Sequence, residues 1–464
     1  MTPGAQIAAA TTLLEEIERG GAPADDIVGN YFRRHRFAGS SDRGGISGHI
    51  YAVLRHRAAL DWWIERASGG HAGEGLPVDA RSRMLAALVL AEGWTLAEVD
   101  KACDGDRFRP RPLSPGEQRL LAALTGHDLL HPEMPAHVRG NFPEWLEPYL
   151  VRALGQKLTE ESAALNGAAS LDLRINRLKA KEDGGDRDGL RLSLRQERDV
   201  RASVTPFSPL GLRVKDRIAL STLPEFKQGL IEVQDEGSQI AALLADARPG
   251  MRVVDFCAGA GGKTLALAAE MRNRGHLIAC DISAPRLERA TQRLRRAGAS
   301  MVQRRHLTSQ RDKWVKQHAG GFDRVFVDAP CTGTGTWRRN PDAKWRLREQ
   351  DVIELVALQF EILDSAERLV KPGGRLIYAT CSLLVEENER QIERFLDSHP
   401  DYSVLPVGTI WHDVVGGPCP VEADMLRLTP ARHGTDGFFV AVLERRAPEP
   451  AEMPHDSLTE TEHR

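Results

Sequence analysis

The chain has 464 residues and a formal net charge of −3, with 41% hydrophobic and 27% charged residues. This length exceeds what one hydrophobic core usually supports, so two or three globular domains are expected. No stretch approaches the roughly 18 to 20 consecutive apolar residues that cross a bilayer, and the N-terminus lacks the basic start of a signal peptide. We therefore expect a cytoplasmic protein without a membrane partner.

Residues 1–140 have the pattern of an all-α domain. Amphipathic runs at residues 8–19, 48–67 and 82–92 are separated by turns rich in Gly, Pro and Asp. No cluster of catalytic residue types occurs in this region.

Residues 143–228 predict a small α+β module. A helical stretch at 143–165 is followed by a strand-like run at 171–178, where apolar and polar residues alternate in DLRINRL, residues 172–178. Several short strand-like runs continue to about Phe226.

Residues 229–445 repeat the order strand, glycine turn, helix, which predicts a doubly wound α/β sheet. The predicted strands are 252–256, 276–280, 301–304, 324–327 and 375–379, and the predicted helices are 263–272, 284–296, 349–370 and 386–399. Residues 425–428 and 438–443 would add a hairpin. Residues 446–464, rich in Pro and Glu, predict a disordered tail.

The first predicted strand runs into a glycine-rich turn, VVDFCAGAGGKT, at residues 253–264. A phosphate loop would require Gly at the position of Cys257, and a dinucleotide fingerprint would require Gly at the position of Thr264. Asp281 ends the second strand, where a carboxylate can bind two ribose hydroxyls. This favours a methyl-donor cofactor, although the glycines could also only tighten a turn and Asp281 only cap a helix.

The chain has six cysteines, none of them in a Cys-x-x-Cys pair, so we expect reduced thiols and no metal site. Cys331 directly follows the fourth predicted strand and Cys381 the fifth. Ligands of such sheets bind at the carboxyl ends of the strands, so both thiols would face one cleft if the two strands are neighbours. The spacing alone leaves catalytic and structural roles equally open. The other four, Cys103, Cys257, Cys280 and Cys419, have the pattern of small buried residues.

Four segments together resemble the signature motifs of the Nop/Sun family of RNA cytosine-C5 methyltransferases. They are QDEGSQ at 234–239, CAGAGGK at 257–263, DAPCTGTGTWRRNPDAKW at 328–345 and TCSLLVEENE at 380–389. The resemblance covers about residues 143–443 and is most similar to the bacterial RsmB group, which acts on 16S ribosomal RNA. DRGGISGHIYAVLRH at 42–56 resembles, less strongly, the NusB-like N-terminal domain of that group.

The resemblance implies a Rossmann-like methyltransferase domain preceded by an RRM-like α+β module and a NusB-like domain. Cys381 would be the nucleophile, Cys331 would assist release of the product, Asp328 would hold the cytosine edge, and Lys263 would be an active-site cation. S-adenosylmethionine would bind to the backbone and side chains of Cys257, Ala258, Gly259, Ala260, Gly261, Gly262, Lys263, Asp281 and Asp328. The resemblance suggests small-subunit ribosomal RNA as the substrate and leaves a tRNA or another ribosomal RNA site open. Apart from the resemblance, we expect a monomer without a metal.

One departure from the family concerns the acid that usually follows the third strand and contacts adenine. Here that segment reads RRHLTSQ, residues 304–310, and contains no acid. A neutral hydrogen bond contributes only about 0.5 to 1.5 kcal/mol, so its loss would weaken cofactor binding up to about tenfold.

The chemistry needs a thiolate, because cytosine C5 becomes nucleophilic only after a group adds to C6. The base must also leave its stack, so cations and aromatic rings would hold the flanking RNA. The candidates are Arg338, Arg339, Lys344, Arg346 and Arg348, interleaved with Trp337 and Trp345, and, in the middle module, Arg174, Asn176 and Arg177. Alternatively, the basic residues of this segment form a solvated helix end, and its tryptophans belong to the hydrophobic core.

Two other functions compete. A DNA cytosine methyltransferase would use Cys331 as its nucleophile and leave Cys381 without a role. A non-catalytic RNA-binding assembly factor would not need the combination of Lys263, Asp328, Cys331 and Cys381.

Overall fold

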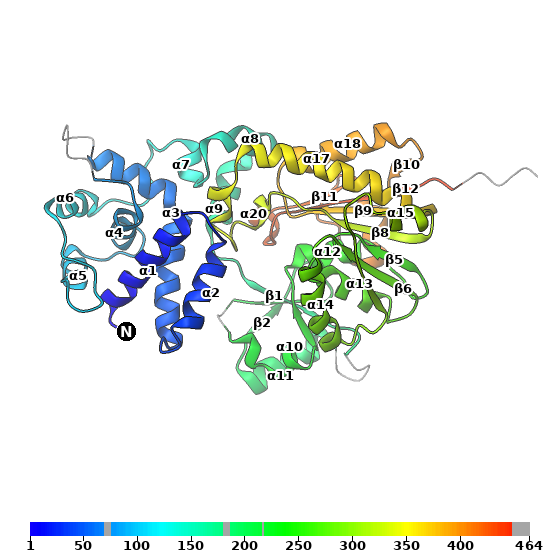
Figure 1. Ribbon diagram of the computed structural model, residues 1–464, viewed down its shortest axis with the longest axis horizontal. Coiled ribbons are helices and arrows are strands. Elements are labelled where there is room, and N and C mark those ends of the chain that lie inside the picture. Colours follow the sequence, from blue (N-terminus) through cyan, green and yellow to red (C-terminus); the bar gives the residue numbers. More distant parts are fainter. Residues whose placement is uncertain (69–75, 180–185, 216–217, 448–464) are drawn as a thin grey trace, which may run out of the picture.

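The computed structural model describes residues 1–68, 76–179, 186–215 and 218–447 (Figure 1). The helices of the N-terminal region lie at one end of the molecule, and the large sheet with its covering helices lies at the other. The predicted tail at 446–464 falls, from residue 448 on, outside the described residues. No helix among the described residues is long and apolar enough to span a membrane.

The N-terminal region is helical, as expected. Its helices are α1 (Pro3–Glu18), α2 (Ala24–Arg34), α3 (Ser40–Ser68), α4 (Ala80–Leu90), α5 (Leu96–Ala102), α6 (Pro115–Leu124) and α7 (Ala136–Gly140). Asp79, Thr95 and Ser114 begin three of them with capping boxes, which satisfy backbone N–H groups that the first turn leaves free. One hydrophobic core extends from Ile7 to Val138.

The predicted helical stretch at 143–165 forms α8 (Glu147–Leu154) and α9 (Leu158–Asn166). These helices pack on the α/β domain, not on the small sheet that follows them: Leu150 and Leu165 share a core with Trp337 and Leu383. Burial of their apolar faces by a domain that comes later in the chain could not be predicted from local periodicity.

The middle module has the order β1 (Leu171–Ile175), α10 (Arg187–Arg198), β2 (Ala202–Val204), β3 (Gly211–Val214), α11 (Pro224–Lys227) and β4 (Ile231–Val233). Its strands form an antiparallel sheet in the order β2-β3-β1-β4, the βαββαβ arrangement of the expected RRM-like module. Since β4 pairs with β1, the small sheet extends to Val233, beyond the expected boundary at residue 228.

The large sheet has the strand order β10-β12-β9-β8-β5-β6-β7, and β11 pairs with β12. The parallel strands are β5 (Arg252–Asp255), β6 (His276–Asp281), β7 (Val302–His306), β8 (Phe322–Asp328) and β9 (Val370–Thr380). The expected hairpin is present as β11 (Leu426–Leu428) and β12 (Phe438–Arg445). The short edge strand β10 (Tyr402–Val404) was not predicted.

Alternate residues of the central strands face two separate cores, and helices cover both faces of the sheet (Figure 1). Val253 packs with α12 (Glu236–Leu243), α13 (Gly262–Glu270), α14 (Ala284–Ala297) and α19 (Val407–Val414). Val254 packs with α15 (Lys313–Gln317), α17 (Glu349–Ala366) and α18 (Glu389–Ser398). This is the predicted doubly wound α/β domain. The strand order reverses between β5 and β8, where such folds bind ligands.

Candidate active site

A cavity of about 660 Å³ lies at the carboxyl ends of β5, β6, β8 and β9. It is lined by nearly all of the expected cofactor and catalytic residues: Cys257, Ala258, Gly259, Ala260, Gly262, Lys263, Asp281, Asp328, Cys331 and Cys381. Gly261 does not line it. Instead, this residue precedes α13 with a left-handed φ of 81°, and an added Cβ would lie 3.1 Å from the Ala290 side chain, so glycine is required there for conformation and space.

The loop after β5 and the acid after β6 are joined directly. The Asp281 carboxylate accepts hydrogen bonds from the backbone N–H of Gly259 at 2.8 Å and of Ser283 at 2.7 Å. Each carboxylate oxygen retains further acceptor capacity, and Asp281 lines the cavity, so the pair of oxygens fits two ribose hydroxyls. Gly259 has a left-handed φ of 55°. Among the described residues, no atom outside this glycine and its two chain neighbours lies within 4 Å of the position that a Cβ would take there, so this part of the loop is open. The residues present therefore fit the expected cofactor.

Lys263 and Asp328 form an ion pair on the cavity wall, with Nζ 2.7 Å from Oδ2. Burial opposes the charge of the lysine, but the Asp328 carboxylate more than compensates and raises the pKa of Lys263 above its usual value. Lys263 is therefore a permanent cation at neutral pH, and it also lies close enough to interact electrostatically with Cys381.

The sulfur atoms of Cys331 and Cys381 are 3.5 Å apart, and both thiols are free. The hydrogen bond to Cys381 and burial raise the pKa of Cys331 well above its usual value. Cys331 therefore remains a thiol that can donate a proton or hydrogen bond to the sulfur of Cys381.

Glu387, which sequence reasoning did not single out, connects the two thiol-bearing loops. Its carboxylate accepts from the backbone N–H of Thr332 at 2.9 Å, from the hydroxyls of Thr332 and Ser382, and from Gln359 at 2.8 Å. Thr332 follows Cys331 and Ser382 follows Cys381, so one buried side chain sets the relative position of both cysteines. Glu387 lies within the TCSLLVEENE segment, which was the available signal.

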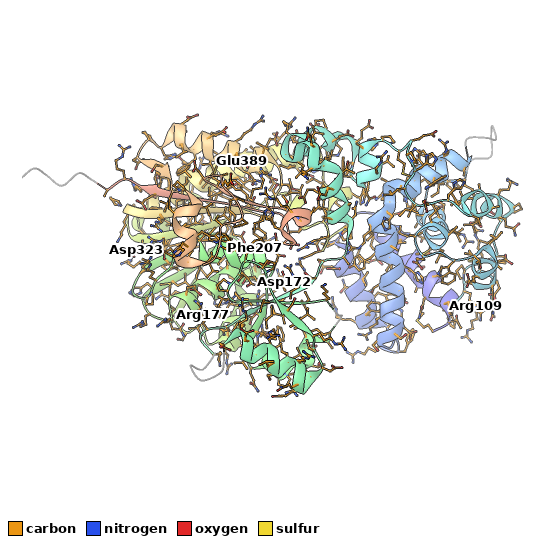
Figure 2. All side chains as sticks on the ribbon, turned by 180° about the vertical axis from the view of Figure 1, so that it is seen from behind. Arg109, Asp172, Arg177, Phe207, Asp323 and Glu389 are labelled. Atoms are coloured by element: carbon orange, nitrogen blue, oxygen red, sulfur yellow. The ribbon has the colours of Figure 1, made fainter. Side chains whose placement is uncertain are left out.

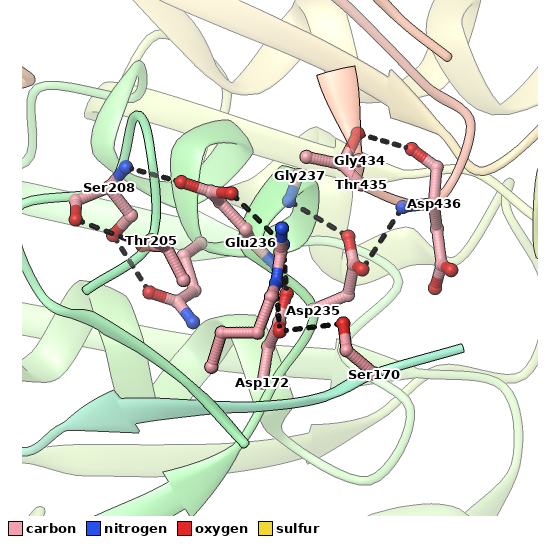
Figure 3. A network of polar contacts seen from close by, with 12 residues as sticks. Ser170, Asp172, Thr205, Ser208, Asp235, Glu236, Gly237, Gly434, Thr435 and Asp436 are labelled. Carbon is pink, nitrogen blue, oxygen red and sulfur yellow. Dashed lines mark hydrogen bonds and ion pairs between the residues drawn. The ribbon is translucent and has the colours of Figure 1, made fainter. Parts of the chain in front are cut away.

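The expected RNA contacts Arg338 and Arg339 are held in a network of two carboxylates. Asp235 accepts from Nη2 of Arg338 at 3.1 Å and of Arg339 at 3.0 Å, and Asp436 accepts from Nε of each at 2.5 and 2.6 Å. Figure 3 shows Asp235 and Asp436 side by side, joined through the backbone N–H of Asp436. Burial and the nearby Asp436 raise the pKa of Asp235. Arg338 is only 7% exposed, so as folded it cannot contact RNA, which corrects our expectation.

A second part of the same network ties the small module to the α/β domain (Figure 3). Arg213 of β3 binds Asp172 of β1 and Glu236 of α12 at 2.8 and 3.1 Å. Glu236 also accepts from the backbone N–H of Ser208 at 2.8 Å. This face of the small sheet is therefore occupied by the interface with the α/β domain.

Lys344 is also a correction. It is 1% exposed, and its ammonium donates to Oδ1 of Asn166 at 2.7 Å and lies 5.3 Å from the ring centre of Trp337, itself a core residue. Burial, together with the charge of Arg55, lowers the pKa of Lys344 to about 7. Trp337 is therefore a core residue, as in the alternative interpretation of this segment. Trp345 is partly exposed, and the Arg57 guanidinium lies over its ring.

In the middle module, Arg174 and Asn176 are buried at 2% and 1% exposure, where they bind Gln234 and the backbone of Gly229 and Ala297. Neither is available to RNA, again contrary to expectation. Arg177, labelled in Figure 2, is half-exposed and pairs with Glu270 at 3.0 Å. Glu270 ends α13, whose other end carries the cofactor loop, so Arg177 lies outside the cavity.

The segment after β7 places Leu307 and Gln310 in the cavity wall, and neither is acidic. The departure noted in the sequence is therefore also a feature of the folded site. Among the described residues, no group of three or more His, Cys, Asp or Glu side chains could hold a metal ion.

Comparisons with known proteins identify the family of this chain. The family model described as 16S rRNA methyltransferase RsmB/F matches residues 242–444. A ribosomal RNA small subunit methyltransferase B of Erwinia tasmaniensis is 35% identical over 94% of this chain and 98% of its own length. A probable ribosomal RNA small subunit methyltransferase B of Synechocystis sp. is 30% identical over 93% of this chain and 98% of its own.

The solved structure of the protein PH0851 is 27% identical and covers 96% of this chain and 99% of its own, with a TM-score of 0.73. The likeness thus extends over the helical region, the small sheet and the α/β domain together. By both sequence and architecture, this chain belongs to the ribosomal RNA small subunit methyltransferase B family.

Proposed function

We propose that this protein methylates C5 of a cytosine in small-subunit ribosomal RNA through a covalent bond between Cys381 and C6 of the base. The observation that supports the proposal best is the pair of thiols 3.5 Å apart, in the same cavity as the Lys263–Asp328 ion pair. S-adenosylmethionine supplies the methyl group when it is bound by the loop of residues 257–263 and by Asp281.

Cys381 adds to C6 as a thiolate, which makes C5 nucleophilic. An ordinary thiol is only a few per cent ionised at neutral pH. Two groups lie next to Cys381: the Lys263 cation and the thiol of Cys331, whose sulfur is 3.5 Å from that of Cys381.

Asp328 holds the cytosine edge, at N3 or the exocyclic amine, while Lys263 keeps its carboxylate in place at 2.7 Å. After the methyl group has been added, a base removes the C5 proton, and the electron pair of that C–H bond restores the ring double bond as the Cys381 thiolate leaves. Cys331, protonated because its pKa is raised, lies where it assists this elimination.

Of the expected RNA contacts, four with exposed or partly exposed side chains remain in the proposal: Arg177, Arg339, Arg346 and Arg348. Arg339 lines the cavity, and its side chain is 29% exposed. Nη1 of Arg339 donates to the backbone oxygen of Ser170 and Nη2 to Asp235, and the second N–H of each, which has no acceptor among the described residues, could bind a phosphate of the target nucleotide. A cytoplasmic location and action as a monomer belong to the same proposal.

The second thiol argues against the DNA-enzyme assignment, in which Cys331 would be the nucleophile and Cys381, in the same cavity and 3.5 Å from it, would have no role. A non-catalytic assembly factor would not require the thiol pair to be held by a buried glutamate.

The experiment is bisulfite sequencing of 16S ribosomal RNA from cells with the gene, without it, and with the Cys381→Ala variant in its place. We expect one cytosine to lose its protection in the last two strains. The proposed function would be contradicted if the strain without the gene and the Cys381→Ala strain both kept every cytosine protected that is protected in the strain with the gene.

A further inference from the structure

One end of the cavity forms an apolar slot beside Asp281. Ile282 follows that acid and is 61% exposed, and Leu307, Leu358 and Ile362 also line the cavity. The backbone N–H of Leu307 donates to the backbone oxygen of Asp281 at 3.0 Å, so the slot begins next to the proposed ribose site. A planar base attached to that ribose would lie between these side chains.

No carboxylate among the described lining residues is free to bind the edge of such a base in this slot. Five aspartates line the cavity. Asp281 is at the ribose position, and Asp328 pairs with Lys263. The other three, Asp172, Asp235 and Asp436, bind Arg213, Arg338 and Arg339 on the side of the small module.

Gln310 lies in the slot and is held by α17 at two points. Its backbone oxygen accepts from the hydroxyl of Ser365, and its side-chain Nε2 donates to the carboxylate of Glu361. A carboxylate only accepts hydrogen bonds, so the amide nitrogen must face Glu361. The side-chain oxygen of Gln310 then has no donor among the described residues.

We propose that the side-chain carbonyl of Gln310 accepts a hydrogen bond from the exocyclic amine of the cofactor's adenine, and that Glu361 is the positioning residue that prevents this amide from turning over. Adenine presents an N–H donor at this position, whereas hypoxanthine presents a carbonyl oxygen, which an orientated amide carbonyl repels. Gln310 therefore takes the place of the acid that this chain lacks after its third strand, and sets the specificity for the base. The inference rests on the proposed function.

The test is calorimetric binding of S-adenosylhomocysteine and of S-inosylhomocysteine, its hypoxanthine counterpart, to the full chain. We expect the wild-type protein to prefer the adenine compound. Gln310→Leu should reduce affinity for that compound by between about twofold and tenfold, the contribution of one neutral hydrogen bond, so that the preference is largely lost.

Glu361→Gln provides an independent test, because the new amide can either donate or accept and no longer fixes the orientation of Gln310. We expect this variant to gain affinity for the hypoxanthine compound while it binds the adenine compound nearly as well as the wild-type protein does. Gln303→Leu, on the exposed edge strand β7, is the matched control and should change neither affinity.

An unaltered preference in both Gln310→Leu and Glu361→Gln would overturn the inference. If the wild-type protein bound neither compound, the proposed function itself would be contradicted, which separates the two failures.

Discussion

The sulfur of Cys331 lies 3.5 Å from that of Cys381, although the two residues are 50 positions apart in the chain. The contact arises because β8 and β9 are adjacent parallel strands, with Asp328 opposite Ala379, so the segments that follow them emerge side by side. The backbone N–H of Gly335 also donates to the carbonyl of Cys381 at 2.9 Å. The fold thus creates a thiol pair, and the predictions begin with the separate roles of its members.

Replacement of the two cysteines should have different consequences. Cys381→Ala removes the group that adds to C6, so neither methylated RNA nor a covalent complex should form. Cys331→Ala allows addition and methyl transfer but slows elimination, so methylated RNA should remain bonded to Cys381. The measurement is denaturing gel electrophoresis with labelled RNA, in which the complex migrates as a slow band.

The double variant, Cys331→Ala with Cys381→Ala, is the control and should give no slow band. A covalent band from Cys381→Ala, or none from Cys331→Ala, would reverse the assignment of the nucleophile.

Asp281→Ala should weaken binding of S-adenosylhomocysteine at least tenfold. Charge-assisted hydrogen bonds contribute about 1.5 to 3 kcal/mol each, and two ribose hydroxyls lose their acceptor. Asp281 also accepts from Gly259 and Ser283, so Asp281→Asn, which keeps one acceptor oxygen, should show a smaller loss. Calorimetry measures both, and equal affinities for the variants and the wild-type protein would rule out the ribose role.

Arg338→Ala should lower the free energy of unfolding. Its direct effect on RNA binding should be small, because the side chain is buried. The substitution leaves Asp235 and Asp436 with fewer partners in a buried site, a change that typically costs about 3 to 5 kcal/mol. Arg348→Ala is the matched comparison, because Arg348 is 76% exposed and its pair with Asp351 is screened by water, so it should contribute little to stability. Thermal unfolding should separate the two variants. A normal melting temperature for Arg338→Ala would show that the network does not stabilise the domain junction.

Because His56 is partly buried and uncharged in the folded chain, the free energy of unfolding should decrease as the pH falls into the mildly acid range. Burial, with the charges of Lys344 and Arg55, lowers the pKa of His56 to about 4. The unfolded chain takes up this proton near pH 6.5, while the folded chain does not until about pH 4, so stability is lost as the pH falls through this window. Between pH 7 and pH 5 the loss is at most about 2 kcal/mol.

Melting temperatures at pH 7 and pH 5 measure this effect. His56→Gln should reduce the difference between them, and His412→Gln, at a side chain that is 89% exposed, should leave it unchanged. Identical pH dependence in the wild-type protein and His56→Gln would contradict the assignment.

The sequence by itself determined the features that depend on local pattern and motif. The repeated order of strand, glycine turn and helix predicted β5, β6, β8 and β9, and these strands, which pack on both faces, are apolar along most of their length. The glycines at 259 and 261 marked a turn that adopts left-handed φ values, and Asp281, Cys331 and Cys381 were each recognisable from their positions after strands.

Only the tertiary structure decided which charged residues are available to ligands. Arg338 and Lys344 lie in a strongly basic, polar segment that resembles an exposed RNA contact, yet both are buried by partners that are distant in the chain. Asp436, which binds Arg338, is 98 residues away, and Asn166, which binds Lys344, is 178 residues away. Likewise, Glu387 and Gln310 acquire their significance from neighbours on other elements. The cost of burying a charge is offset by specific partners in space, and local sequence does not reveal where those partners are.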